Sequence, residues 1–124
     1  MANYIDGFVF PIPRKHLDQY QQVAHEVSKI WKEHGALSYS EYVGEDMHLE
    51  GTLSFYDALN TKEDEIVIFG WVEFDSKESR DLANQKVAND GRISELIAPL
   101  IDPSGIIFNA DRMAFGGFNC LIHI

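Results

Sequence analysis

Four strand-like and two helix-like segments follow one another along this chain in the order β-α-β-β-α-β. The strand-like segments are apolar or alternating runs, and the helix-like segments repeat their apolar residues every three or four positions. In the ferredoxin-like arrangement, which has this order, the four strands form one antiparallel sheet and both helices cover the same face. The sequence therefore predicts an α+β ferredoxin-like fold.

The first half of the chain supplies two strands, one helix and an irregular segment. Residues 3–10 form a strand that we expect Pro11 and Pro13 to end, because proline removes backbone donors from a sheet. Residues 14–34 have apolar positions at helical spacing, and Gly35 follows as a typical helix-ending residue. Residues 37–43 alternate as a second strand, and residues 46–64 predict a long ordered excursion.

The second half begins with the strongest strand, EIVIFGWVEF at residues 65–74. A helix is expected over residues 76–89, with Asp75 as its N-cap and Glu78 completing a capping box. Gly91 interrupts this pattern, and residues 92–100 predict a second short helical piece. The last strand is expected from about Arg112 to the C-terminus.

The length and charge of the chain limit its possible partners. A chain of 124 residues predicts a single domain, residues 1–124. The net charge of −10 argues against binding to nucleic acid or to an anionic membrane surface. The N-terminus lacks the pattern of a signal peptide, and Cys120 is the single cysteine, so we expect a cytoplasmic protein.

Both faces of the predicted sheet are apolar. Residues 66–72 (IVIFGWV) are apolar on both sides of the strand, although the sequence offers only one layer of helices. Leaving such a face in water would forgo about 25 cal/mol per Å² of apolar area. We therefore expect a homodimer in which the sheets of two copies pack face to face.

Two adjacent glycines interrupt the last strand, at Gly116 and Gly117 in RMAFGGF. Successive residues of a strand point to opposite faces, so the pair removes one side chain from each face. We expect the glycines to let a large neighbour, another backbone or a ligand approach closely.

Five segments of the chain resemble corresponding segments of one known protein family. They are residues 4–9 (YIDGFV), 34–37 (HGAL), 69–74 (FGWVEF), 76–86 (SKESRDLANQK) and 112–118 (RMAFGGF). Together they resemble the bacterial YbaA-like family, a family of unknown function in the dimeric α/β-barrel superfamily. The resemblance implies a ferredoxin-like subunit that pairs into a β-barrel dimer, and it implies no activity. Haem-degrading members of the superfamily use a histidine on the second helix; residues 76–89 contain none, so no cofactor is expected.

Asp6 and Trp71 are the candidate catalytic residues. A carboxylate inside an apolar strand must face water or be paired, and the possible partners of Asp6 are Arg80, Arg92 and Arg112. Asp6 is either a base with a raised pKa or one half of a structural ion pair. As a base, it would act on a small substrate held by Trp71 and an arginine in the cleft between sheet and helices. Trp71 has an alternative interpretation as a large core residue.

Arg80, Asn84 and Arg112 are the candidate ligand-binding residues. Arg80 and Asn84 are four positions apart near the start of the predicted helix, where a carboxylate-bearing metabolite would meet backbone donors. The same two residues could instead form a polar helix flank or part of a dimer seam. The histidines show no metal-ligand spacing, so no metal site is predicted.

Two functions agree with these residues. The first is a small acidic homodimer that binds a metabolite or a partner in the cleft between sheet and helices without transforming it. The second is a cofactor-independent enzyme, monooxygenase-like or isomerase-like, that acts on a small aromatic or carbonyl compound. The sequence offers no assembled nucleophile, metal cluster or phosphate loop, which favours the first function and leaves enzymatic activity open.

Overall fold

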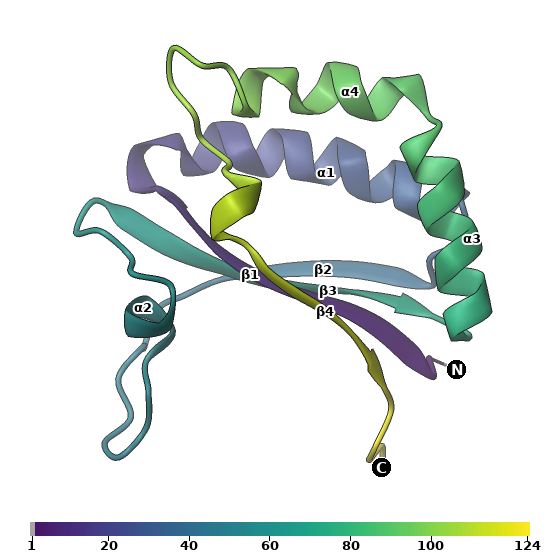
Figure 1. Cartoon of the computed structure of the whole chain (residues 1–124), viewed down its shortest axis with the longest axis horizontal. Helices are drawn as coiled ribbons and strands as arrows, with labels where there is room; N and C mark the ends of the chain where they lie inside the picture. Colours follow the sequence, from purple (N-terminus) through teal and green to yellow (C-terminus); the bar gives the residue numbers. More distant parts are fainter. Residues whose placement is uncertain (1) are drawn as a thin grey trace.

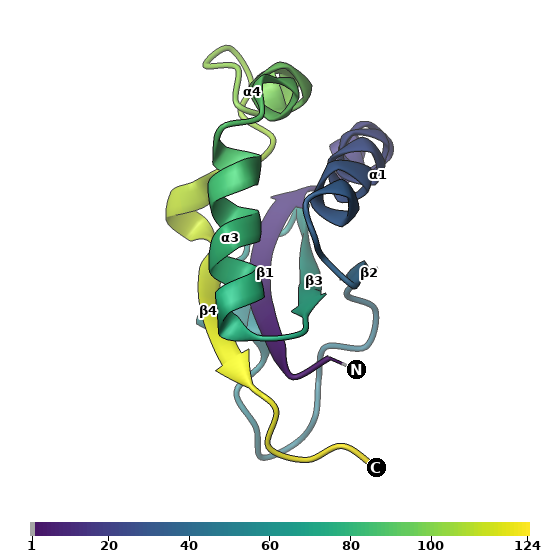
Figure 2. The ribbon, with the colours of Figure 1, turned by 90° about the vertical axis from the view of Figure 1, so that its right-hand side faces the viewer.

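The computed structural model describes residues 2–124. Four strands form one antiparallel sheet in the order β2-β3-β1-β4, with β1 at Tyr4–Pro13, β2 at Ser38–Val43, β3 at Glu65–Phe74 and β4 at Ala114–Asn119. The helices α1 (Leu17–Glu33), α3 (Lys77–Ala88) and α4 (Gly91–Ile97) lie on one side of this sheet (Figures 1 and 2). The predicted ferredoxin-like fold is confirmed.

The antiparallel register separates the two faces of the sheet. On the face beneath the helices, here called the covered face, Tyr4, Asp6, Phe8 and Phe10 of β1 lie opposite Phe74, Val72, Gly70 and Ile68 of β3. The opposite, or open, face has no layer of long helices (Figure 1). It carries Ile5, Gly7 and Val9 of β1, Phe69 and Trp71 of β3, and Gly116 and Phe118 of β4.

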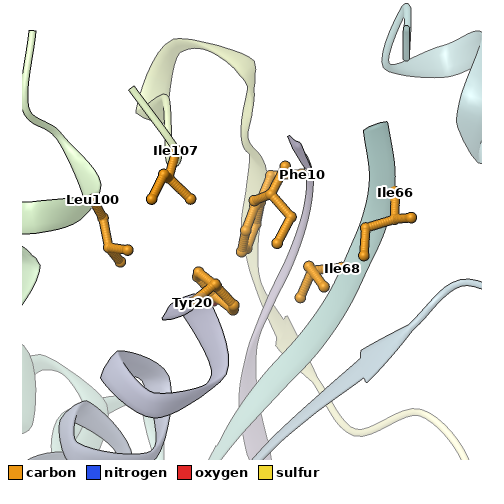
Figure 3. Packing of buried hydrophobic residues seen from close by; sticks show 7 residues of the cluster. Phe10, Tyr20, Ile66, Ile68, Leu100 and Ile107 are labelled. Carbon is orange, nitrogen blue, oxygen red and sulfur yellow. The ribbon is translucent and has the colours of Figure 1, made fainter. Parts of the chain in front are cut away.

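The main core lies between the covered face, α1 and the segment that leads into β4. Figure 3 shows its buried side chains, which are Phe10, Ile12, Tyr20, Ile66, Ile68, Leu100 and Ile107. The ring of Phe10 makes edge contacts with Tyr20 at 5.6 Å and with Phe108 at 5.0 Å between centroids. Each fully buried side chain of this kind contributes about 1.5–3 kcal/mol to folding. This core fixes α1 over one end of the sheet.

The prediction that prolines end the first strand at residue 10 is wrong, because β1 continues through Pro11 to Pro13. The N–H of Arg14 donates to Asp64 O, on the side of β3. Successive backbone N–H positions of a strand face opposite neighbours, so the nitrogens of Pro11 and Pro13 face away from β3. On that side β4 pairs with β1 only as far as Val9, so the missing donors cost no ladder hydrogen bond.

Helix boundaries lie within three residues of the predictions, but Gly91 begins α4, which ends at Ile97, and the cap of α3 needs a correction. Gly35 has a φ of +116° directly after α1, a left-handed conformation that suits glycine. The side chain of Ser76, not Asp75, caps α3 by accepting a hydrogen bond from Ser79 N–H at 3.1 Å. Serine and aspartate are about equally good caps, so pattern alone did not choose between neighbours.

The last strand is shorter than predicted. Arg112 lies in a 3₁₀ turn (Ala110–Arg112), and β4 ends at Asn119 instead of running to the terminus. Asn119 pairs with Tyr4, the first residue of β1, and Cys120 N–H donates to Asn3 O at 3.1 Å, so the N-terminal strand is nearly exhausted at this point.

The predicted excursion, residues 46–64, contains the short helix α2 (Phe55–Ala58) and lies beneath one end of the open face (Figure 1). Phe55 contacts Phe69 of β3 at 5.7 Å between ring centroids. Arg112 ties the end of the excursion to the start of β4, because its guanidinium binds both oxygens of Glu65 and the carbonyl of Asn60. The excursion therefore covers only part of the open face.

Candidate functional site

A cavity of about 270 Å³ lies between the covered face and the helices. Aromatic rings form much of its wall: Phe8, Phe10, Tyr20, Trp31, Tyr39, Phe108 and Phe115. Aliphatic side chains of α1, α4 and β3 fill most of the remaining wall, and Asp6 and Asn84 are its acidic and amide residues. A volume of this size suits a small organic molecule.

Asp6 lies in the cavity wall and is paired with α3. Arg80 donates from Nη1 to Asp6 Oδ1 at 3.0 Å and from Nη2 to the hydroxyl of Tyr4 at 2.9 Å. The Asp6 carboxylate is buried, with a side-chain exposure of 5%, and Arg80 is 14% exposed. Of the three arginines considered, Arg80 is thus the one that pairs with Asp6.

Burial raises the pKa of Asp6, and the Arg80 guanidinium opposes this by favouring the charged form. The nearby carboxylate of Asp81 raises the pKa further. A carboxyl group of this kind can exchange a proton more readily near neutral pH than a free aspartate can. The geometry is also that of a structural ion pair, so both interpretations of Asp6 remain chemically possible.

Asn84 lies one turn after Arg80 on α3 and reaches the cavity wall. Its carboxamide makes no side-chain hydrogen bond to the residues the structure describes, so a donor and an acceptor are available to a bound molecule. The structure therefore places Asp6, its partner Arg80 and Asn84 around one end of the cavity, whereas the sequence had linked only Arg80 with Asn84 and had left the partner of Asp6 open.

The other two predicted residues lie elsewhere. Trp71 is opposite Gly7 in the register, on the open face, so the expectation that it shares a cleft with Asp6 is wrong. Its ring stacks on Tyr42 at 5.3 Å, and its indole N–H donates to Glu73 at 3.2 Å. Arg112 binds Glu65, with nitrogen–oxygen distances of 2.5 and 2.9 Å, away from the cavity.

Sequence reasoning missed a second carboxylate beside the cavity. Glu41 of β2 accepts hydrogen bonds from the hydroxyls of Tyr20 and Tyr39, the latter at 2.7 Å. Burial raises the pKa of Glu41, whereas the two hydroxyl donors lower it. In the strand SYSEYV, Glu41 lies two residues after Tyr39 and therefore on the same face of the sheet. The contact with Tyr20 depends on the packing of α1, which the sequence pattern does not indicate.

The glycine pair has a different neighbour on each face. Position 117 faces Tyr4, and a Cβ there would overlap the Tyr4 hydroxyl that binds Arg80. Gly116 pairs with Gly7 on the open face, where the ring of Phe118 lies 3.3 Å from a Cβ built at either position. The pair therefore makes room for one ring on each side of β4, as predicted.

The open face contains a hollow of about 410 Å³ lined by Ile5, Gly7, Val9, Phe69, Trp71, Gly116 and Phe118, among others. Phe69 is 42% exposed and Phe118 is 56% exposed. Within residues 2–124, three or more His, Cys, Asp or Glu side chains do not gather in a group able to hold a metal ion. None of the helices described by the structure has the length and apolar character needed to cross a membrane.

The fold and the cavity define a small α+β protein of the ferredoxin-like class. The family model described as "Protein of unknown function (DUF1428)" matches residues 3–102. The chain is 36% identical to the uncharacterized protein YbaA of Escherichia coli K12 over 119 residues, which cover 96% of this chain and 97% of YbaA. The chain therefore belongs to the DUF1428 family.

Two solved structures show the same fold at low sequence identity. A dimeric ferredoxin-like protein from an uncultured marine organism has a TM-score of 0.58 and 8% identity, covering 100% of this chain and 92% of that chain. A NIPSNAP family protein of unknown function from Agrobacterium tumefaciens has a TM-score of 0.54 and 15% identity, covering 96% and 88%. These similarities establish the architecture and leave the chemistry to the site itself.

Proposed function

We propose that this protein is a homodimer that binds a small, mainly apolar molecule in the cavity between the sheet and the helices. The cavity itself is the observation that carries the proposal: it is a concave, mainly apolar space that the side chains of the subunit leave unfilled. Here an apolar space of about 270 Å³ is edged by the free carboxamide of Asn84 and by Asp6. An apolar wall with a few polar groups is the usual composition of a ligand site.

The homodimer is supported by the open face. Its exposed aromatic side chains and the bare glycines at positions 7 and 116 form a contiguous apolar surface, which monomeric proteins rarely leave in water. One structural neighbour is described as dimeric. Sedimentation at micromolar concentration should give twice the 14.1 kDa chain mass, and a mass of one chain would remove this part of the proposal.

The cavity can be tested with its own tryptophan. Trp31 lies in the wall, so the variant Trp71→Phe leaves one indole that reports on binding by fluorescence. A set of small aromatic and aliphatic compounds should contain molecules that change this signal saturably and raise the melting temperature, because a ligand that binds the native state stabilises it.

A variant that fills the cavity tests whether the cavity is the binding site. Ala24→Phe would fill the cavity from α1, and Ala88→Phe makes the same change on the exposed side of α3. We expect binding to be lost in the first variant and kept in the second. Equal binding by Ala24→Phe and the unchanged protein would show that the cavity is not the site.

A second candidate function is proton transfer by Asp6. The observation that favours it is a buried carboxylate with a raised pKa in the wall of an apolar cavity. In an isomerisation, Asp6 would take a proton from a carbon beside a carbonyl and return it to another carbon, with no redox change. Asp6→Asn should then abolish turnover and retain ligand binding, whereas retained turnover would exclude Asp6 as the base.

A further inference from the structure

The wall of the cavity is rich in aromatic rings and has no basic side chain. Seven rings face it, and Lys, Arg and His are absent from the lining among the residues that the structure describes. The faces of aromatic rings carry partial negative charge and attract cations, most strongly where water is excluded. The wall is therefore suited to a neutral or positively charged molecule.

The charge of Asp6 is already balanced. Arg80 binds it directly, and the Nε of Arg80 also lies 3.0 Å from Asp81, so this guanidinium faces two carboxylates. Arg80 consequently offers no excess positive charge to a ligand. The earlier hypothesis of a carboxylate-bearing metabolite held by Arg80 loses its electrostatic support.

Glu41 differs from Asp6 because no cation balances it. Both of its oxygens accept from tyrosine hydroxyls, and none of the salt bridges within the described residues includes it. Tyr20 and Tyr39 present their rings to the cavity and their hydroxyls to Glu41. Donation to a carboxylate makes a phenol ring richer in electrons, so Glu41 strengthens the attraction of both rings for a cation.

We infer that the ligand of this cavity is a small organic cation, an amine or substituted ammonium on an apolar skeleton. The inference rests on the proposed function and adds the chemical class. The ammonium lies among the rings near Tyr20 and Tyr39, where Glu41 supplies the balancing charge. The apolar part fills the space toward Val23, Ala24 and Val27, and Asn84 is free to accept or donate a hydrogen bond.

Three probes of matched shape test the charge. They are 2-phenylethylamine, 2-phenylethanol and 3-phenylpropanoate, titrated at pH 7 against the Trp71→Phe protein and followed by Trp31 fluorescence. The amine should bind about tenfold more tightly than the alcohol, because the Glu41 carboxylate balances its positive charge beside the two tyrosine rings. The carboxylate should bind most weakly.

Variants at Glu41 test the source of the preference. Glu41→Gln keeps the shape and removes the charge, and Glu63→Gln makes the same change at an exposed position outside the cavity. Glu41→Gln should reduce the preference for the amine about tenfold and leave the alcohol within about twofold, because only the cation feels the carboxylate. Glu63→Gln should change neither.

The outcomes separate this inference from the proposed function. Binding of the alcohol or the carboxylate as tightly as the amine, blocked by Ala24→Phe, would overturn the inference and support the cavity as a binding site. An amine preference that survives Glu41→Gln would also overturn the role given to Glu41. Failure of all three probes to bind would count against both proposals.

Discussion

The two faces of the sheet differ in how many of their side chains find contacts within the same subunit. On the covered face, the Asp6 carboxylate meets Arg80, and Tyr4 fills the space above Gly117. On the open face, Gly7 and Gly116 lie side by side with no side chain, and the exposed ring of Phe118 borders the hollow. The same strands thus carry one face whose contacts are completed within the subunit and one whose apolar side chains are left exposed.

This difference shows that a glycine pair can serve two separate purposes. Gly117 allows a contact inside the subunit, so a side chain added there would reduce the stability of the fold. Gly116 lies on the exposed open face, so a side chain added there would mainly reduce the affinity between two subunits. Substitutions on the two faces should therefore separate folding from dimerisation.

The largest effect is expected at Gly117. Gly117→Val should destabilise folding by about 3 kcal/mol or more, because its Cβ would overlap the buried Tyr4 hydroxyl and approach Tyr4 Cζ to 3.0 Å. Urea unfolding followed by circular dichroism measures this. Gly116→Val is the matched change and should fold with little loss but dimerise more weakly.

A rescue experiment sharpens this comparison. Tyr4→Phe removes the overlapping hydroxyl, so the double variant Tyr4→Phe/Gly117→Ala should be less destabilised than the sum of the two single changes. Additive losses would show that Tyr4 does not explain the glycine.

An effect of similar size is expected from breaking the buried ion pair. Arg80→Met should cost about 3–5 kcal/mol, because it leaves the buried Asp6 carboxylate without a partner. Lys77→Met is the control, since its pair with Asp81 is exposed and should contribute little to stability.

The loss of stability in the Arg80→Met variant should also depend on pH. Without Arg80, burial and the Asp81 carboxylate raise the pKa of Asp6 further. The folded variant then favours the protonated acid, and its stability deficit relative to the unchanged protein grows as pH rises. A deficit that shrinks with rising pH would contradict this assignment.

On the open face, Phe118→Glu should weaken dimerisation roughly a hundredfold and leave the subunit folded, because burying an unpaired carboxylate costs several kcal/mol. Analytical ultracentrifugation over a range of concentrations measures it. Leu82→Glu, at a 51% exposed position on α3, is the control. If Leu82→Glu dissociated the dimer and Phe118→Glu did not, the interface would lie on the helices.

The smallest effect is expected at Glu41 in the absence of ligand. Its pKa is raised by burial, so the folded protein keeps the Glu41 proton to a higher pH than the unfolded chain does, and stability is lost as pH rises from 4.5 until the carboxyl ionises. Glu41→Gln lacks this titration, and its stability relative to the unchanged protein should therefore increase with pH. Denaturant titrations from pH 4 to pH 7 test the sign.

The sequence predicted the elements that depend on local pattern and missed contacts that depend on packing. Strand β3 has the predicted bounds, because its uninterrupted apolar run lies between clear turn and capping signals. The continuation of β1 through two prolines depends on which side β4 leaves unpaired, and no local pattern carries that information.

The candidate site was predictable to the same extent. A carboxylate within an apolar strand required a partner, so the sequence indicated an arginine for Asp6, but only the fold selects Arg80 over Arg92 and Arg112. Trp71 was assigned to the wrong face because both faces of β3 are apolar, and alternation alone does not say which face the helices cover. Glu41 was missed because its partners come from β2 and α1, which the fold brings together.

The prolines of β1 have a consequence for how the chain meets other strands. Past Val9, the side of β1 that faces away from β3 has no strand beside it, and a free sheet edge is a template for pairing with foreign chains. At positions 11 and 13 that edge offers no N–H donors. An incoming strand would leave its own carbonyls unsatisfied there, and Pro11 is itself buried, so this edge is protected against aggregation while the open face remains exposed.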